Sequence, residues 1–245
     1  MKALAAYRQQ KACEADGLFV VEGIKMAEEA LRSGWKIRVL CATPEAWRAI
    51  EDRHDATLVS VELYEAKPEQ IERLSSLRTP QGIWLLVERP QAVEVSRNED
   101  FVLALDGIQD PGNMGTILRT CDWFGVRHVL CSRETVSCYN PKVVQATMGA
   151  IFRTRVEYGD LPQRLVAMKE DGYRVYGAML DGEDAFRATI GKPSLLVIGN
   201  EGHGISAKVA ETIDCRLTIP NIGGTCESLN ASVATGILVS LFAQR

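Results

Sequence analysis

The order of apolar and polar stretches predicts an alternation of strands and helices in the second part of the chain. From residue 101 onward, short apolar runs recur between longer amphipathic stretches, and turn residues separate them. This alternation is typical of a parallel sheet with helices on both faces, because a strand buried on both faces reads as a nearly continuous apolar run. We predict strands at Phe101–Leu105, His128–Cys131, Arg155–Tyr158, Tyr173–Met179, Ser194–Ile198 and Cys215–Ile219, and helices at 113–124, 141–151, 161–171, 205–213 and 229–242.

The first ninety residues carry a smaller set of the same elements. A short amphipathic helix comes first, and it is followed by strands at Leu18–Val21, Ile37–Cys41, Thr57–Val61 and Ile83–Val87, with helices at 22–31, 45–50 and 68–77 between them. A polar stretch with one proline then precedes residue 100. We therefore predict a small α/β domain at 1–90, a linker at 91–99 and a larger α/β domain at 100–245.

Three junctions in the larger domain combine an apolar strand, a turn rich in glycine and polar residues, and the start of a helix. The first runs from Asp106 to Thr120, the second from Gly199 to Ser206, and the third from Ile219 to Asn230. Glycine allows positive φ and close approach of a ligand to the backbone, as we expect at Gly223 and Gly224. We predict that Ser228 is the N-cap of the last helix. Each junction alone also fits an ordinary turn followed by a helix cap.

Together and in this order, the junctions resemble the three motifs of the SpoU (TrmH-type) branch of the SPOUT superfamily of RNA methyltransferases. The matching residues are Asn-x-Gly-x-x-x-Arg at 113–119, Gly-Asn-Glu-Gly-x-Gly-Ile-Ser at 199–206, and Ile-Pro with Ser-Leu-Asn at 219–230. The resemblance covers the C-terminal three-fifths of the chain. It implies a SPOUT-type parallel sheet with a C-terminal trefoil knot, S-adenosylmethionine as cofactor, RNA as substrate, and a homodimer formed through the C-terminal domain.

The N-terminal stretch is similar to the ribosomal-protein-like substrate-binding domain that many SpoU enzymes carry. The similarity rests on the segments Phe19–Gly23 and Thr79–Ile83. The family's first helix is often more basic than the one here, so this helix is a weak candidate for binding RNA. The N-terminal domain nevertheless favours ribosomal RNA as the substrate, because some tRNA-modifying relatives carry only short extensions.

The resemblance implies a set of site residues on the three loops. The catalytic candidates are Asn113, Arg119, Glu201, Ser228 and Asn230, and the cofactor-binding candidates are Ile198, Gly199, Asn200, Gly202, Ile219, Asn221, Ser228 and Leu229. Asn221 stands where other members often carry methionine. Each catalytic candidate has a structural alternative as a cap, a turn residue or a surface charge.

Arg119 is the residue that the family assigns to activating the ribose 2′-hydroxyl. A guanidinium with a pKa above about 12 is a poor base, so we expect it mainly to bind phosphate and orient the hydroxyl. Base catalysis by Arg119 requires transient loss of its proton. We expect Asn113 to orient Arg119 or the ribose, Glu201 to pair with Arg119 or stabilise its loop, and Ser228 and Asn230 to shape the pocket or contact the substrate.

The implied function is 2′-O-ribose methylation of RNA, with ribosomal RNA favoured. Two alternatives stay open: a tRNA 2′-O-methyltransferase of the same family, and a catalytically silent RNA-binding protein on the same fold. The net charge is −4, and dividing the chain after residue 99 gives 14 basic and 16 acidic residues in each part, which is not typical of a basic RNA-binding module. The charge count does not exclude a local basic patch, for which the candidates are Arg119, Arg127, Arg133, Arg153 and Arg155. Such residues usually lie on a solvated surface.

Other chemistries find less support. The Gly-x-Gly-x-x-Gly loop of a Rossmann domain and a P-loop are both missing, and the three histidines have no partners at zinc-ligand spacing, so we predict no metal. Cys226 as nucleophile and His203 as base form a rival site, but neither has an identifiable partner. The seven cysteines lack a Cys-x-x-Cys pair and no apolar run is long enough to cross a membrane, so we expect a cytoplasmic protein with no membrane partner.

Overall fold

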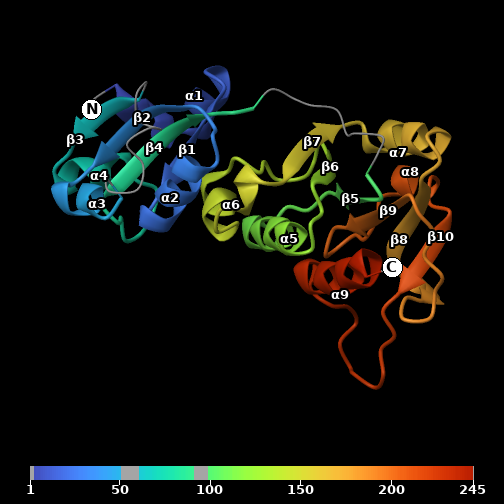
Figure 1. Cartoon of the computed structure of the whole chain (residues 1–245). Coiled ribbons are helices and arrows are strands. Elements are labelled where there is room, and N and C mark those ends of the chain that lie inside the picture. Colours follow the sequence, from blue (N-terminus) through green and yellow to red (C-terminus); the bar gives the residue numbers. More distant parts are fainter. Residues whose placement is uncertain (1–2, 51–60, 91–98, 245) are drawn as a thin grey trace. The chain divides into compact units, whose positions relative to one another are not determined.

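The computed structural model describes residues 3–50, 61–90 and 99–244, and the chain forms two compact units (Figure 1). The first consists of Met1–Gln91 and Ser137–Arg153, and the second of Ala92–Val136 and Thr154–Arg245. No helix among the described residues is long and apolar enough to span a membrane. The two units are described one after the other.

The first unit contains a four-stranded mixed sheet in the order β1-β4-β2-β3. Strand β4 (Ile83–Glu88) pairs antiparallel with β1 (Leu18–Glu22) and β2 (Ile37–Ala42), and β2 pairs in parallel with the edge strand β3 (Glu62–Glu65). The helices are η1 (Leu4–Arg8), α1 (Gln10–Ala15), α2 (Ile24–Arg32), α3 (Pro44–Arg48) and α4 (Pro68–Leu74).

The expected elements of this unit match the observed ones, with one exception. The strand predicted at 57–61 lies outside the described residues except for Val61, and Val61 is not in a strand. The strand found in this region, β3, begins one residue later, and all four of its residues are exposed. A strand that is exposed on both faces does not need apolar residues on either face. It therefore lacks the apolar pattern from which a buried strand is predicted.

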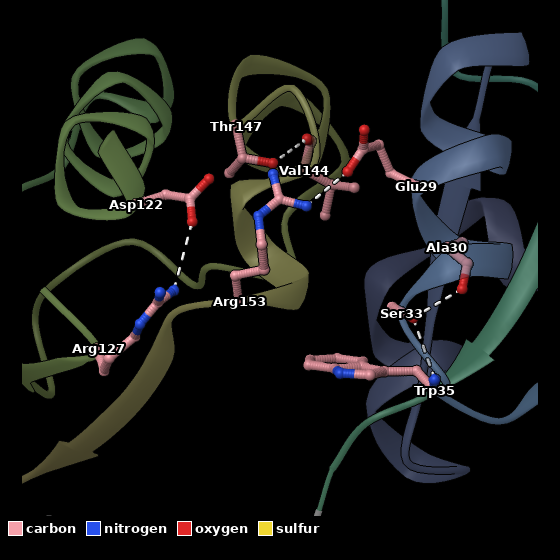
Figure 2. Close-up of polar contacts among 9 residues, drawn as sticks. All are labelled: Glu29, Ala30, Ser33, Trp35, Asp122, Arg127, Val144, Thr147 and Arg153. Carbon is pink, nitrogen blue, oxygen red and sulfur yellow. Dashed lines mark hydrogen bonds and ion pairs between the residues drawn. The ribbon is translucent and has the colours of Figure 1, made fainter. Parts of the chain in front are cut away.

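The segment 137–153 belongs to the first unit although it follows β6 (His128–Ser132) and precedes β7 (Arg155–Gly159) of the second unit. It contains α6 (Pro141–Ala146) and η4 (Ala150–Phe152). The ring of Phe19 lies 5.0 Å from that of Tyr139 and 6.2 Å from that of Phe152, measured between centroids. Figure 2 shows that the guanidinium of Arg153 pairs with the Glu29 carboxylate, at 2.5 Å. Aromatic packing and an ion pair therefore hold this segment against the N-terminal elements. The domain limits 1–90, 91–99 and 100–245 stay a prediction.

The second unit contains a six-stranded sheet in the order β10-β8-β9-β5-β6-β7, and all its pairings are parallel. Its strands are β5 (Phe101–Asp106), β6 (His128–Ser132), β7 (Arg155–Gly159), β8 (Arg174–Asp184), β9 (Ser194–Gly199) and β10 (Cys215–Thr218). Its helices are α5 (Pro111–Trp123), α7 (Leu161–Glu170), α8 (Ala207–Ala210) and α9 (Ala231–Ala243). The predicted parallel sheet is confirmed, and each predicted strand is present.

Helices cover both faces of this sheet, as predicted. On one face, Leu165 of α7 and Val209 of α8 share a buried cluster with strand residues such as Val197. On the other face, Phe242 of α9 stacks on Phe101, with 4.9 Å between the ring centroids. Helix α5 lies beside α9 (Figure 1). The trefoil knot stays a prediction.

Candidate active site

The first two motif loops meet because β5 and β9 are parallel neighbours whose carboxyl ends lie side by side. Asp106 pairs in register with Gly199 at this edge. The buried carboxylate of Asp106 accepts a hydrogen bond from the Ser206 backbone N–H at 2.7 Å. The Asn200 side-chain amide donates to the Gly107 carbonyl, also at 2.7 Å. The loop after β9 is thus bonded at two points to the end of β5.

Glycine at 199 is required by packing of the chain on itself. A Cβ atom there would lie 2.3 Å from the carbonyl carbon of Gly204 and 2.4 Å from the Ile205 nitrogen, far closer than atoms can approach. Asn200 and Gly204 exchange two backbone hydrogen bonds of 2.9 Å, and Gly204 has φ of +67°. The sequence led us to expect that a ligand approaches the backbone closely at the glycines of these loops. At Gly199 it is the backbone of Gly204 and Ile205 that makes this close approach.

Asn113 is the residue at which the three motifs come together. Its side-chain nitrogen donates a hydrogen bond to Glu201 Oε1 in the second motif. Its side-chain oxygen accepts one from Asn230 Nδ2 in the third motif, at 3.0 Å. We call Asn113, Glu201 and Asn230 the polar triad. The structure therefore joins one residue from each motif through a single asparagine side chain.

The caps of the two helices at the site differ from those expected. Asp110 caps α5 by accepting from the Asn113 N–H at 2.8 Å, so Asn113 lies inside the first turn and is not the cap. Asn230 caps α9, because its Oδ1 accepts from the Ser232 N–H at 2.9 Å. The prediction that Ser228 is the N-cap is wrong: the helix begins two residues later than expected. Ser228 makes no hydrogen bond within the described part of the chain.

The loop between β10 and α9 extends away from its sheet (Figure 1), and residues 221–230 are all exposed. Asn221 organises this loop. Its Oδ1 accepts from the N–H groups of Gly223 and Gly224 at 3.1 and 2.7 Å, and its Nδ2 donates to the carbonyls of Gly224 and Cys226 at 3.1 and 3.2 Å. Positive φ was expected at both glycines and occurs only at Gly223, where it is +124°.

The remaining cofactor candidates line the same region. Ile198 is buried at the end of β9, Gly202 is exposed in the turn that follows, and Ile219 is half-buried at the end of β10. Leu229 is 48 % exposed just before α9. Because the polar triad ties the Asn200–Gly204 turn to the start of α9, these residues flank one shared edge of the sheet.

Arg119 stands apart from the polar triad. It lies six residues after Asn113 on α5, and at about 100° per residue the two side chains point about 120° apart around the helix axis. It is exposed, and it has no hydrogen bond or ion pair with any residue that the structure describes. The structure pairs Glu201 with Asn113, whereas a Glu201–Arg119 pair was one of the expected arrangements.

Two of the five arginines considered for a basic patch have acidic partners. Arg127 lies 3.6 Å from the Asp122 carboxylate, and Arg153 pairs with Glu29 in the first unit (Figure 2). Arg133 and Arg155 are exposed. Pairing of this kind cancels part of the positive charge that would attract a phosphate backbone.

Several supporting residues were not predicted from the sequence. The Gly107 N–H lies 3.0 Å from Ser132 Oγ and 3.1 Å from Thr135 Oγ1, which brings the end of β6 to the first motif loop. Nothing local in the sequence signals this contact. Asp110 could have been found, because Asp followed by Pro is a common start of a helix.

Among the residues that the structure describes, the rival chemistry gains no catalytic partner. Cys226 is exposed, and His203 has its Nδ1 3.4 Å from Asn200 Oδ1. Over the described ranges, no group of three or more His, Cys, Asp or Glu side chains could hold a metal ion. Within the described part of the chain, neither residue has beside it the base or orienting group that nucleophilic catalysis needs.

Comparisons with known proteins agree with the motif assignment. Residues 100–240 match the SpoU rRNA Methylase family, and residues 1–84 match the MRM3-like substrate binding domain. The chain is 31% identical over 222 residues to the 23S rRNA (guanosine(2553)-2′-O)-methyltransferase RlmP of Bacillus subtilis, covering 90% of this chain and 86% of that protein.

Two solved structures have the same fold. One is a TrmH-family protein from Porphyromonas gingivalis, with a TM-score of 0.88, 39% identity, and 98% and 95% of the two chains covered. The other is the SpoU methyltransferase AviRb from Streptomyces viridochromogenes in complex with the cofactor AdoMet, with a TM-score of 0.84, 25% identity, and 98% and 95% covered. The chain therefore belongs to the SpoU rRNA methylase family, whose members are S-adenosylmethionine-dependent RNA methyltransferases.

Proposed function

We propose that this protein transfers a methyl group from S-adenosylmethionine to a ribose 2′-hydroxyl of ribosomal RNA. The observation that supports this most strongly is the hydrogen-bonded connection of Asn113 to Glu201 and Asn230. It assembles polar groups from three loops at the carboxyl edge of a parallel sheet, which is where open α/β folds bind ligands.

The cofactor candidates are Ile198, Gly199, Asn200, Gly202, Ile219, Asn221, Ser228 and Leu229, and their arrangement suits S-adenosylmethionine. The loop 221–229 exposes its backbone groups, and the partly exposed Leu229 and half-buried Ile219 supply apolar surface. A planar adenine needs both, since its edge forms hydrogen bonds and its faces are apolar. When bound, the cofactor supplies an electrophilic methyl group on a positively charged sulfur.

The five catalytic candidates take different roles in this proposal. Asn113 holds Glu201 and Asn230 in place, so that the ribose meets a preorganised polar surface. Ser228, which is exposed and has no hydrogen bond in the described part of the chain, is available to the substrate. Arg119 binds an RNA phosphate and orients the hydroxyl, because a planar guanidinium matches a phosphate bidentately.

The choice of ribosomal RNA rests on two similarities. RlmP, to which most of this chain aligns, is named for 2′-O-methylation of 23S rRNA, and residues 1–84 match a substrate-binding domain. The alternatives are tRNA methylation by the same chemistry and a silent RNA-binding protein. We place the activity in the cytoplasm, and the burial of five of the seven cysteines, at 13, 41, 121, 131 and 138, agrees with reduced thiols.

We also propose a homodimer through the second unit. Gly112, Thr116, Arg119 and Trp123 follow one another at helical spacing on the exposed side of α5, and Trp123 is 85 % exposed. On the neighbouring α9, Val233 is 50 % exposed. Exposed tryptophan is typical of the centre of a protein interface, and an interface on this side of α5 would direct Arg119 toward the partner's site. Sedimentation tests this: a strictly monomeric protein at tens of micromolar would contradict it, and Trp123→Ala should weaken a dimer at least tenfold.

Mapping of 2′-O-methyl groups in total RNA, with and without the protein, tests the proposed reaction. We expect one or a few ribosomal RNA positions to lose methylation when the protein is absent and to regain it on addition of purified protein and S-adenosylmethionine. Loss of methylation in tRNA only would favour the first alternative. Unchanged methylation together with no calorimetric binding of S-adenosylmethionine at millimolar concentration would favour the second.

A further inference from the structure

The first unit contains a cavity of about 400 Å³ that lies outside the site described above. The described residues that line it come from β2, α3 and β3, so it lies at the β3 edge of the sheet. Small-molecule and nucleotide sites commonly occupy about 300–1,000 Å³, so the cavity is large enough for a nucleotide base with part of its sugar.

The register of the two strands decides which side chains face the cavity. Leu40 pairs with Leu63, and Ala42 pairs with Glu65. Side chains alternate between the faces of a sheet, so these four lie on one face and form an apolar floor with one carboxylate at its end. Leu40 and Ala42 are buried, whereas Leu63 is 47 % exposed.

Helix α3 supplies the opposite wall. Pro44, Trp47 and Arg48 line the cavity, and their spacing places them on one side of the helix. Trp47 is half-buried and Arg48 is exposed, so an aromatic ring stands beside the floor and a guanidinium stands at the rim. Tyr64 of the edge strand also borders the cavity, and its hydroxyl donates to Glu62 at 3.1 Å.

We propose that this cavity binds an unpaired base of the substrate RNA, an inference that rests on the proposed function. A base has apolar faces, which suit the Leu40 floor and the Trp47 ring, and a polar edge, which suits the charged rim. The Glu65 carboxylate accepts hydrogen bonds from an exocyclic amino group, and Arg48 donates to a ring nitrogen or carbonyl.

The charges at the rim favour a base over a phosphate as the group that enters. Arg48 is the one cation among the described lining residues, and the lining also contains one carboxylate, that of Glu65. A site for the phosphate backbone needs an excess of positive charge, which this rim lacks. A paired base in a helix could not enter, so the site selects a loop, bulge or end of the RNA.

Two measurements on the full-length protein test the proposal. Saturation-transfer NMR with each of AMP, CMP, GMP and UMP, in the presence of saturating S-adenosylmethionine to occupy the proposed adenine site, reports base binding without any methylation. Methylation kinetics on the RNA identified by mapping report its use. The variants are Trp47→Ala and Glu65→Gln, with Glu69→Gln, an exposed glutamate on α4, as the matched control for the second.

We expect Trp47→Ala to abolish nucleotide binding and to raise KM for RNA at least tenfold, with kcat and S-adenosylmethionine affinity within twofold of wild type. Glu65→Gln should remove the preference for the amino-bearing nucleotides AMP, CMP and GMP over UMP and raise KM about threefold, while Glu69→Gln changes nothing. Because Glu65 is exposed, its variant stays informative if Trp47→Ala fails to fold, which thermal melting reveals.

Unchanged nucleotide binding and unchanged KM in folded variants would overturn the proposal. Normal KM on naked RNA combined with lost activity on a protein-bound ribosomal particle would also overturn it and assign the cavity to a protein chain. If the wild type methylates no RNA, the proposed function fails, and loss of nucleotide binding in Trp47→Ala still shows a base site.

Discussion

The polar triad and the loop 221–229 lie at the same edge of the second unit but are held in different ways. The triad is joined by side-chain hydrogen bonds between residues far apart in the sequence. Asp110 caps α5, which carries Asn113, and Asn230 itself caps α9. The loop is exposed throughout, and the side chain of one of its own residues, Asn221, organises it by accepting two hydrogen bonds and donating two. One region is ordered by the fold and the other is ordered locally.

This difference suggests a division of labour. Groups that must keep a fixed geometry during a reaction benefit from support by several elements, because misplacement raises the activation barrier. A loop that covers a ligand needs to open, and such loops belong to the least stable parts of a protein. We therefore expect substitutions in the triad to act on turnover and substitutions in the loop to act on cofactor affinity.

The largest effect is expected at Arg119, which belongs to neither region. Arg119→Ala removes the charge and the planar fork, and Arg119→Lys keeps the charge alone, so both should lower kcat/KM for RNA about 10²–10³-fold. Cofactor affinity, measured by calorimetry, should stay within a few-fold of wild type, because the cationic sulfonium would repel a guanidinium. Loss of cofactor binding in a folded Arg119→Ala protein, or near-normal turnover, would show that this role is wrong.

Asn113→Ala should lower kcat about 10–100-fold, since it disconnects Glu201 from Asn230 at once. Asn230→Ala alone and the double variant test the coupling. The double variant should lose less activity than the product of the two single losses, because both remove the same hydrogen bond. Gln163→Ala, at an exposed position on α7, serves as the control. Independent, multiplying effects would show that the triad does not act as a unit.

Asn221→Ala should weaken S-adenosylmethionine binding about fivefold to tenfold while kcat at saturating cofactor stays near wild type. The reason is that the loop loses the side chain that holds its turn, so binding must order it, at a cost of about 1 kcal/mol. Glu227→Gln, also exposed in this loop, should leave affinity unchanged. A drop in kcat with normal affinity would reverse the division between loop and triad.

The smallest effect is expected at Asp214, which precedes β10 at the opposite end of that strand from the loop. Partial burial alone would raise the pKa of this carboxyl, but Lys169 at 2.6 Å and the Val175 N–H at 2.9 Å hold it below its usual value. A lowered pKa stabilises the fold above the unfolded-state value of about 3.9, and this contribution is lost as pH falls through the folded value.

Asp214→Asn should therefore lower the free energy of unfolding by about 0.5–1 kcal/mol at pH 7, a modest value because Lys169 is partly exposed. Chemical denaturation should show the wild type and the variant converging below about pH 4. The methylation kinetics of the folded Asp214→Asn variant should equal those of the wild type. This result would show that Asp214 contributes to the stability of the sheet and not to function at its carboxyl edge. A difference that grows with acid would contradict the direction of the pKa shift.

The sequence by itself determined the strands and helices of the second unit and the family. Buried parallel strands appear as apolar runs, and each of the three motifs is a contiguous stretch of the chain. The local pattern was therefore sufficient to predict these elements and the family. The pattern was insufficient at β3, because its exposed residues carry no periodic signal. It was also insufficient to choose the N-cap of α9, because serine and asparagine are both good caps and Ser228 and Asn230 are only two residues apart.

Only the tertiary structure decided the contacts between distant residues. The bonds of Asn113 to Glu201 and Asn230 span 88 and 117 positions, and the position of Arg119 relative to them depends on where α5 begins. The same holds for the segment 137–153, which packs on Phe19 although it follows a strand of the other unit. Local propensity specifies whether a stretch forms a helix or a strand. The elements that it packs against depend on which apolar faces must be buried together, and this is decided by the whole chain.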